Sequence, residues 1–215
     1  MPRPEGAAPG REKKVLRAAE QLRPDVQERR ARWLVEVLGL DPAKLVFIDE
    51  TACTTAMTRR YGRAPRGQRL YARAPWGHWK TTTSLAALRT DGLHAPSVIG
   101  GALNGAPFPA WVRQELAPTL KAGDVVIMDN LACHKAAGVR EAIEAAGAKV
   151  AYLPPYSPEF NPIGQVFAKL KGLLRKAEER TVEGPWQALG RLLDQFSPEE
   201  CGNDIRHCGY AATSL

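Results

Sequence analysis

Long apolar runs are missing from this 215-residue sequence, and cysteine is scarce. No apolar stretch approaches the roughly 18 residues that a membrane-spanning helix needs, and the first twenty residues lack a signal-peptide core. The four cysteines form no Cys-x-x-Cys pair. Cys201, His207 and Cys208 could be imagined as metal ligands, but free thiols in a reducing compartment are favoured. We therefore expect a cytoplasmic protein with no membrane partner.

Acidic residues are also absent between Thr51 and Thr90, a segment with eight basic residues in a chain whose net charge is only +7. A run of one sign inside a folded domain is typical of a polyanion-binding surface, since a solvated face normally mixes signs. Its aromatic rings could stack on bases or could equally pack under a hairpin. The candidate nucleic-acid-binding residues of this segment are Arg59, Arg60, Arg63, Arg66, Arg69, Arg73, His78, Trp79 and Lys80. Such phosphate contacts would be salt-sensitive and largely independent of base sequence.

The remaining composition is ordinary for a globular protein, with 44% apolar and 25% charged residues. The length suffices for one domain with a proper core and some appendages. The glycine-rich segment 100–105 fits neither a P-loop nor a dinucleotide fingerprint, which excludes a nucleotide site of either kind.

Two short apolar runs, 45–51 and 124–130, each include an acid near the end, Asp49 and Asp129. Such runs bounded by polar residues predict buried strands. An acid at a strand end can simply cap a turn or the next helix. Two acids at equivalent ends of central strands instead favour a site, because open α/β sheets place their sites there.

The other segments predict an α/β protein with a mixed sheet. Residues 79–88 and 93–99 are expected to form a hairpin around Asp91-Gly92, a strong turn signal, and to pair with the strand at 45–48. A strand at 149–153 follows a helix, which implies a parallel crossover from the strand before it. Helices are expected at 11–21, from Pro24 to Leu38, and at 110–120, 135–146, 187–196 and 198–208.

A proline-rich segment leads into one more helix. Pro154, Pro155 and Pro158 favour extended backbone. Asn161 is a good N-cap, and proline suits the first helical position that follows it. The apolar positions then recur with helical spacing at Ile163, Val166, Phe167, Leu170, Leu173, Leu174 and Ala177. Another face of this helix carries Gly164, Lys171 and Arg175, and the two basic residues are further candidates for DNA contact.

These motifs together resemble bacterial insertion-sequence transposases of the Tc/mariner superfamily. The segments that carry the resemblance are Phe47-Ile-Asp-Glu-Thr51, Ile127-Met-Asp-Asn130 with His134-Lys135, and Leu153-Pro-Pro-Tyr-Ser-Pro-Glu-Phe-Asn-Pro-Ile163. The resemblance implies an RNase H-like fold, with a five-stranded sheet of three antiparallel and then parallel strands. It also implies an Asp, Asp, Glu (or Asp) triad that binds two Mg²⁺ ions, or Mn²⁺. Asp49 and Asp129 match the first two acids.

The third acid of the resembled family falls on Gly164, which leaves 34 residues between it and Asp129. Two-metal cleavage needs two ions about 3.5–4 Å apart, and carboxylates are the ligands that Mg²⁺ prefers. Glycine provides no ligand, so we expect the second metal to be lost and the activity to be impaired. Glu159 is a conceivable but poorly directed substitute. Glu50, Asn130 and His134 are possible auxiliary residues, and His134 could orient a phosphate or water or be a plain helix-start residue.

The resemblance also implies a domain organisation. We expect a basic N-terminal arm and helix at 1–43, a catalytic domain at 44–180 and a helical extension at 181–215. No space remains for the helix-turn-helix domain of the resembled family, so the chain is expected to be the catalytic half of a transposase. The expected partners are double-stranded DNA at transposon ends and targets, and a second copy or an intact transposase. Alternatives are a non-enzymatic DNA-binding remnant, or another RNase H-like nuclease.

Overall fold

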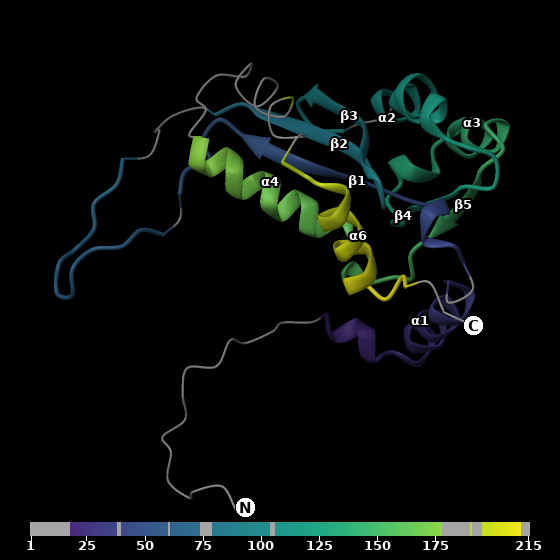
Figure 1. Ribbon diagram of the computed structural model, residues 1–215, viewed down its shortest axis with the longest axis horizontal. Coiled ribbons are helices and arrows are strands. Elements are labelled where there is room, and N and C mark those ends of the chain that lie inside the picture. The colour runs from purple at the N-terminus through teal and green to yellow at the C-terminus, as the bar shows by residue number, and fades with distance from the viewer. Residues whose placement is uncertain are drawn as a thin grey trace, which may run out of the picture.

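The computed structural model describes residues 18–37, 40–59, 61–73, 79–103, 106–177, 190 and 195–211. Its centre is a five-stranded sheet in the order β3-β2-β1-β4-β5 (Figure 1). The strands are β1 (Leu45–Thr54), β2 (Thr81–Arg89), β3 (Gly92–Gly100), β4 (Val125–Met128) and β5 (Lys149–Tyr152). β1, β2 and β3 pair antiparallel, whereas β4 is parallel to both β1 and β5. The predicted mixed sheet, its hairpin and its parallel crossover are therefore confirmed.

Alternation along β1 divides the interior into two cores. Leu45 and Phe47 belong to a core that includes side chains from α1 (Pro24–Val37), α4 (Ile163–Ala177) and α6 (Pro198–His207). Val46 and Ile48 belong to a second core, with α2 (Pro107–Trp111) and α3 (Val139–Ala145). Successive side chains of a strand point to opposite faces, so Asp49 and Glu50 must also face opposite sides of the sheet.

The first strand is longer than the sequence predicted. Its parallel pairing with β4 ends at Phe47, opposite Ile127, but its antiparallel pairing with β2 continues to Thr54. The expectation that this strand ends at Asp49 was therefore wrong, because β2 alone supports the last part of β1. Asp49 lies just beyond the β1–β4 ladder, while Asp129 directly follows β4.

Two predicted helices differ from the observed ones. The segment predicted as a helix at 110–120 begins earlier, with α2, and continues through a π-helical stretch (Val112–Leu116) and a 3-10 turn (Ala117–Thr119). Pro118 has no amide hydrogen for a regular helical bond. The segment 135–146 is divided by Gly138, whose φ of 84° is left-handed, into a 3-10 turn (Cys133–Lys135) and α3. Only glycine adopts that conformation without strain.

The N-terminal and C-terminal helices pack on the first core. In α1 the buried side chains are Val26, Trp33 and Val37, whereas Leu34 is 40% exposed. The helix α6 agrees with the prediction at 198–208. Residues 11–17, Leu38 and most of the helix predicted at 187–196 lie outside the described residues. Among the described helices, none is long and apolar enough to cross a membrane.

Candidate active site

Asp49 and Asp129 line one open cavity of about 730 Å³. Gly164, in the first turn of α4, lines it as well, and so does Asn161. The rest of the wall comes from the residue pair after Asp129 and from the proline-rich turn between β5 and α4: Asn130, Leu131, Leu153, Pro154, Pro155, Tyr156, Ser157 and Pro158. The structure thus brings together the three positions that the sequence predicted to converge.

Asp49 is held by two hydrogen bonds. Its Oδ2 accepts from the Asn161 side-chain amide at 2.8 Å, and its Oδ1 accepts from the backbone N–H of Glu50 at 2.8 Å. Burial raises the pKa of the Asp49 carboxyl to about 7, and the bond from the Glu50 amide opposes that rise only in part. The nearby charges of Glu50 and Asp129 raise it further. Ionisation of this buried carboxylate costs free energy, and a bound cation would offset that cost.

Asp129 is in a different electrostatic environment. Its Oδ1 lies 2.7 Å from His134 Nδ1 and accepts from the backbone N–H of Leu131 at 2.9 Å. Burial alone would raise the pKa of the Asp129 carboxyl, but the hydrogen bonds from His134 and Leu131 hold it below its usual value. Asp129 is therefore charged at neutral pH and has a fixed orientation.

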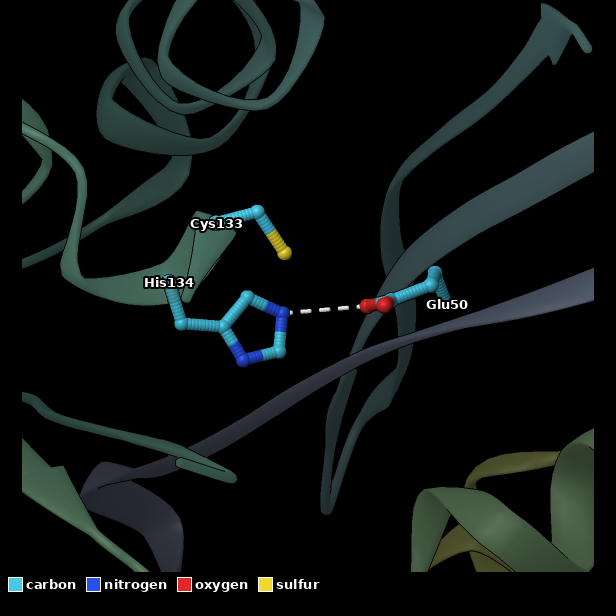
Figure 2. A group of neighbouring side chains, drawn as sticks. All are labelled: Glu50, Cys133 and His134. Atoms are coloured by element: carbon cyan, nitrogen blue, oxygen red, sulfur yellow. Dashed lines mark hydrogen bonds and ion pairs between the residues drawn. The ribbon is translucent and has the colours of Figure 1, made fainter. Parts of the chain in front are cut away.

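His134 is completely buried and connects two acids. Its Nε2 lies 3.0 Å from Glu50 Oε2, as Figure 2 shows, and its ring packs on Phe108 with centroids 4.6 Å apart. Burial disfavours the charged imidazolium, but hydrogen bonds to Asp129 and Glu50 outweigh it and raise the pKa of His134 to about 9. His134 therefore neither orients a phosphate or water in the cavity nor serves as a plain helix-start residue. Its side chain does not line the cavity and instead holds the Asp129 carboxylate in place.

The predicted N-cap role of Asn161 was wrong. Its side-chain nitrogen donates to Asp49, and its Oδ1 is buried without a hydrogen-bond partner in the described part of the chain. Helix α4 begins instead with a backbone bond, from the Gly164 N–H to the Asn161 carbonyl at 3.1 Å. The sequence indicated a helix-capping residue at position 161, but only the fold shows that its side chain contacts Asp49, 112 residues away.

Gly164 is exposed, and its backbone does not require glycine. A Cβ atom built there would meet nothing within 4 Å, and the residue has ordinary helical geometry without a positive φ. The space beside Asp49 and Asp129 could therefore hold a longer side chain. Gly172, on the same helix, is equally open.

The other auxiliary candidates support the cavity wall. Glu159 forms an ion pair with Arg30 of α1 and is not among the residues that line the cavity. Arg30 also donates to Ser157 Oγ at 2.6 Å and lies over the Phe160 ring, so α1 braces the proline-rich turn. Asn130 donates its side-chain amide to the Leu153 carbonyl, which links the ends of β4 and β5. No pattern in the sequence indicated that Arg30 would contact the proline-rich turn.

Residues 55–59 and 61–73 of the β1–β2 connection leave the body of the molecule as a long loop (Figure 1). Tyr61 and Tyr71 are 91% and 81% exposed, so packing under the hairpin was a wrong alternative for both rings. The described candidates here are all exposed: Arg59, Arg63, Arg66, Arg69, Arg73, Trp79 and Lys80. Arg60 and His78 lie outside the described residues. Arg89, the last basic residue of the run, is buried in an ion pair with Asp124 and is not available to DNA.

The basic face of α4 lies beside the later part of β1. Burial raises the pKa of the Cys53 thiol on β1, and the charges of Lys171 and Arg175 oppose that rise, which locates both residues near this strand. Both side chains are half-buried. The basic face of α4 and the basic β1–β2 connection therefore lie near each other at the C-terminal end of β1.

The residues of the cavity suit one hard divalent cation. Asp49 and Asp129 offer carboxylate oxygens to the same space, and Mg²⁺ and Mn²⁺ prefer such donors. The buried, unpartnered Oδ1 of Asn161 is a further neutral oxygen beside Asp49. Gly164, where the sequence comparison with the resembled family predicted a third acid, lines the same cavity but has no side chain to offer as a ligand.

Comparisons with known proteins agree with this geometry. The model of the DDE superfamily endonuclease family matches residues 44–183. The Mos1 transposase paired-end complex with the left transposon end superposes with a TM-score of 0.72 at 20% identity, over 93% of this chain and 64% of that one. The catalytic domain of Mos1 mariner transposase gives a TM-score of 0.63 at 17% identity, over 91% and 92% of the two chains. The search among curated proteins found no match.

The similarity to the Mos1 catalytic domain confirms the expected RNase H-like fold. A third structure, the Mos1 paired-end complex with Mg, gives a TM-score of 0.73 at 21% identity and likewise covers 93% of this chain and 64% of that one. The chain thus spans a little less than two thirds of the Mos1 chains in these complexes.

Proposed function

Because this chain belongs to the DDE superfamily endonucleases, we propose that it is the catalytic domain of a Tc/mariner-type insertion-sequence transposase with impaired or lost DNA cleavage. The observation that carries the proposal is the open space at Gly164, beside Asp49 and Asp129 in one cavity. A glutamate would fit there without a clash. No acidic side chain lines that space other than the two aspartates, as far as the chain is described.

The retained residues would hold one Mg²⁺ or Mn²⁺ ion through Asp49 and Asp129. When bound, such an ion supplies Lewis-acid polarisation of a phosphate oxygen and a more acidic water. Asn161 orients Asp49, and His134 with the Leu131 amide orients Asp129. What is missing is the carboxylate that would neutralise and hold a second ion, and with it the clamp on both oxygens of the displacement.

Similarity to Mos1 supports the choice of substrate and partners. Mos1 transposase has been solved in a paired-end complex with a transposon end and in a strand transfer complex. Its paired-end complexes contain Mg or Mn. By this analogy the partners of the chain are double-stranded transposon ends and target DNA, and the assembly is a homodimer or a mixed pair with an intact transposase.

DNA binding without cleavage is the second candidate function. The exposed basic residues described in the β1–β2 connection are not among those that line the cavity with Gly164, so the lack of a third acid leaves this surface intact. A chain that occupies transposon ends or pairs with an intact transposase, yet cannot cut, would act as a dampening regulator.

A cleavage assay on pre-cut and uncut ends, in Mg²⁺ or Mn²⁺, tests the proposal with the parent chain and Gly164→Glu. We expect activity to rise by about 10²-fold or more in the variant, the size typical of restoring one group that stabilises transition-state charge. Gly172→Glu is the matched control, since it places the same side chain on the same helix away from the cavity. It should leave the activity unchanged.

The outcomes are distinct. Full activity in the parent chain would contradict the impairment. Equal inactivity of parent and Gly164→Glu would point instead to missing end recognition, and Mn²⁺ binding would then show whether the variant gains a second ion. We also expect Gly164→Glu to melt no lower than the parent without metal, because glycine costs about 0.5–1 kcal/mol inside a helix. A clear drop would mean that glycine is structurally required.

A further inference from the structure

We propose that Glu50, Cys133 and His134 form a site for a borderline-soft divalent cation, namely Zn²⁺, distinct from the cavity of Asp49 and Asp129. One ligand atom of each residue, a carboxylate oxygen, a thiol sulfur and an imidazole nitrogen, lies within 4.8 Å of the other two. Figure 2 shows the three side chains directed toward a common space between β1 and the turn before α3.

The donor set selects the cation. Nitrogen and sulfur ligands together with one carboxylate are typical of zinc, which three protein ligands and a water can hold in a tetrahedron. Mg²⁺ prefers oxygen ligands and near-octahedral geometry, so it should favour Asp49 and Asp129 instead. The two sites would therefore separate hard from softer cations by ligand chemistry.

His134 is already oriented as a metal ligand would be. Its Nδ1 lies 2.7 Å from Asp129 Oδ1, its ring packs on Phe108, and its Nε2 is directed toward Glu50 at 3.0 Å. A histidine whose second nitrogen is bound to a carboxylate is the usual outer arrangement of zinc sites, because that bond fixes the ring and makes the ligand more basic. The side chain needs no rotation to bind a cation through Nε2, which releases its proton to solvent when the cation binds.

The strand separates the two sites. Asp49 faces Asn161 and the start of α4, whereas the next residue, Glu50, faces His134 on the other side of the sheet. None of Glu50, Cys133 and His134 lines the cavity. The two sites are linked by the contact between His134 and Asp129 and by the backbone bond from the Glu50 N–H to Asp49, and zinc bound to Glu50, Cys133 and His134 would displace neither cavity acid. This inference does not depend on the proposed transposase function.

Titration of the full chain with Co²⁺ under reducing conditions tests the site, because cobalt replaces zinc and a bound thiolate gives a near-ultraviolet charge-transfer band. We expect the band in the parent chain, its loss in Cys133→Ser, and its displacement by Zn²⁺. Cys208→Ser is the matched control, since Cys208 is half-buried like Cys133 but distant from this cluster in the fold. Asp49→Asn, which alters only the cavity, should keep the band.

Zn²⁺ affinity, measured by competition with a chromophoric chelator, provides the second readout. We expect Cys133→Ser and Glu50→Gln to weaken binding by at least about tenfold, as loss of even outer-sphere partners does. Circular dichroism would show whether both variants are folded. Absence of the cobalt band in the parent, or its survival in folded Cys133→Ser, would overturn the site and leave the cluster as support for Asp129 alone.

Discussion

The cavity edge and the β1–β2 connection are opposite kinds of functional surface within one domain. At the cavity edge, Asp49 and Asp129 have fixed partners contributed by the α4 approach and by the buried His134. Along the connection, the basic residues and two tyrosines are exposed. One region is preorganised for a small cation, whereas the other is adaptable, as suits a polyanion whose contacts are set by charge.

This difference explains how the cavity edge could lack the proposed third carboxylate at position 164 and still keep its shape. The supports of Asp49 and Asp129 come from Asn161, His134 and the backbone, and none of them passes through the side chain at position 164. Since a Cβ at Gly164 would meet nothing within 4 Å, the packing of the described residues does not depend on a side chain at this position. A site of this kind can become inactive while the domain remains stable and basic.

The variant expected to have the largest effect on the cavity edge, and so to separate it most clearly from the β1–β2 connection, is His134→Ala. It leaves the Asp129 and Glu50 carboxylates without the buried imidazole that contacts both, and because the Asp129 side chain is 39% exposed the expected cost is about 2–3 kcal/mol, below that of a fully buried pair. The free energy of unfolding, from urea titration at pH 7, should fall by that order. His94→Ala is the control, because His94 pairs with exposed Asp91 and should cost less than about 1 kcal/mol. Equal effects would contradict the preorganisation of the cavity edge.

The pH dependence of stability should distinguish Asp49 from an ordinary surface acid. Its pKa of about 7 lies above the unfolded value of 3.8, so the folded state binds the extra proton. The Asp49 contribution is therefore complete below about pH 4 and is lost as the pH rises through about 7. We expect Asp49→Asn to be more stable than the parent by about 1–3 kcal/mol at pH 8, with the difference shrinking toward pH 5.

Added Mg²⁺ at pH 8 sharpens the same measurement. It should stabilise the parent chain and have little effect on Asp49→Asn, because a ligand that binds the folded state raises its stability. A parent chain that is insensitive to both pH and Mg²⁺ would show that Asp49 is ionised without cost and does not face a cation site.

The smallest stability effect belongs to the connection. Replacing Arg63, Arg66 and Arg69 together by alanine should change the free energy of unfolding by less than about 0.5 kcal/mol. The same variant should lower the salt dependence of DNA binding, as the slope of log Kobs against log salt, by about 2 to 3. Arg140→Ala, which removes an exposed arginine of α3, should leave that slope unchanged. An unchanged slope in the triple variant would place the DNA surface elsewhere.

Local patterns in the sequence were sufficient for the positions of the strands along the chain, the hairpin at Asp91-Gly92, and the helix that begins near Gly164. Each depends on short-range rules of periodicity and turn chemistry. The same motifs indicated that Asp49 and Asp129 would meet at that helix start. Helix interruptions such as the left-handed Gly138 were missed, since propensity gives no φ for a single glycine.

Tertiary structure alone decided which partners hold the acids. Asn161 contacts Asp49 across 112 residues and His134 contacts Glu50 across 84, and no local pattern encodes a contact between such distant positions. Asp49 and Glu50 face opposite sides of the sheet because β1 continues past both residues. That continuation depends on the pairing of β1 with β2. Burial raised the pKa of Asp49, whereas hydrogen bonds from His134 and Leu131 lowered the pKa of Asp129, because both shifts depend on the three-dimensional environment of the residue.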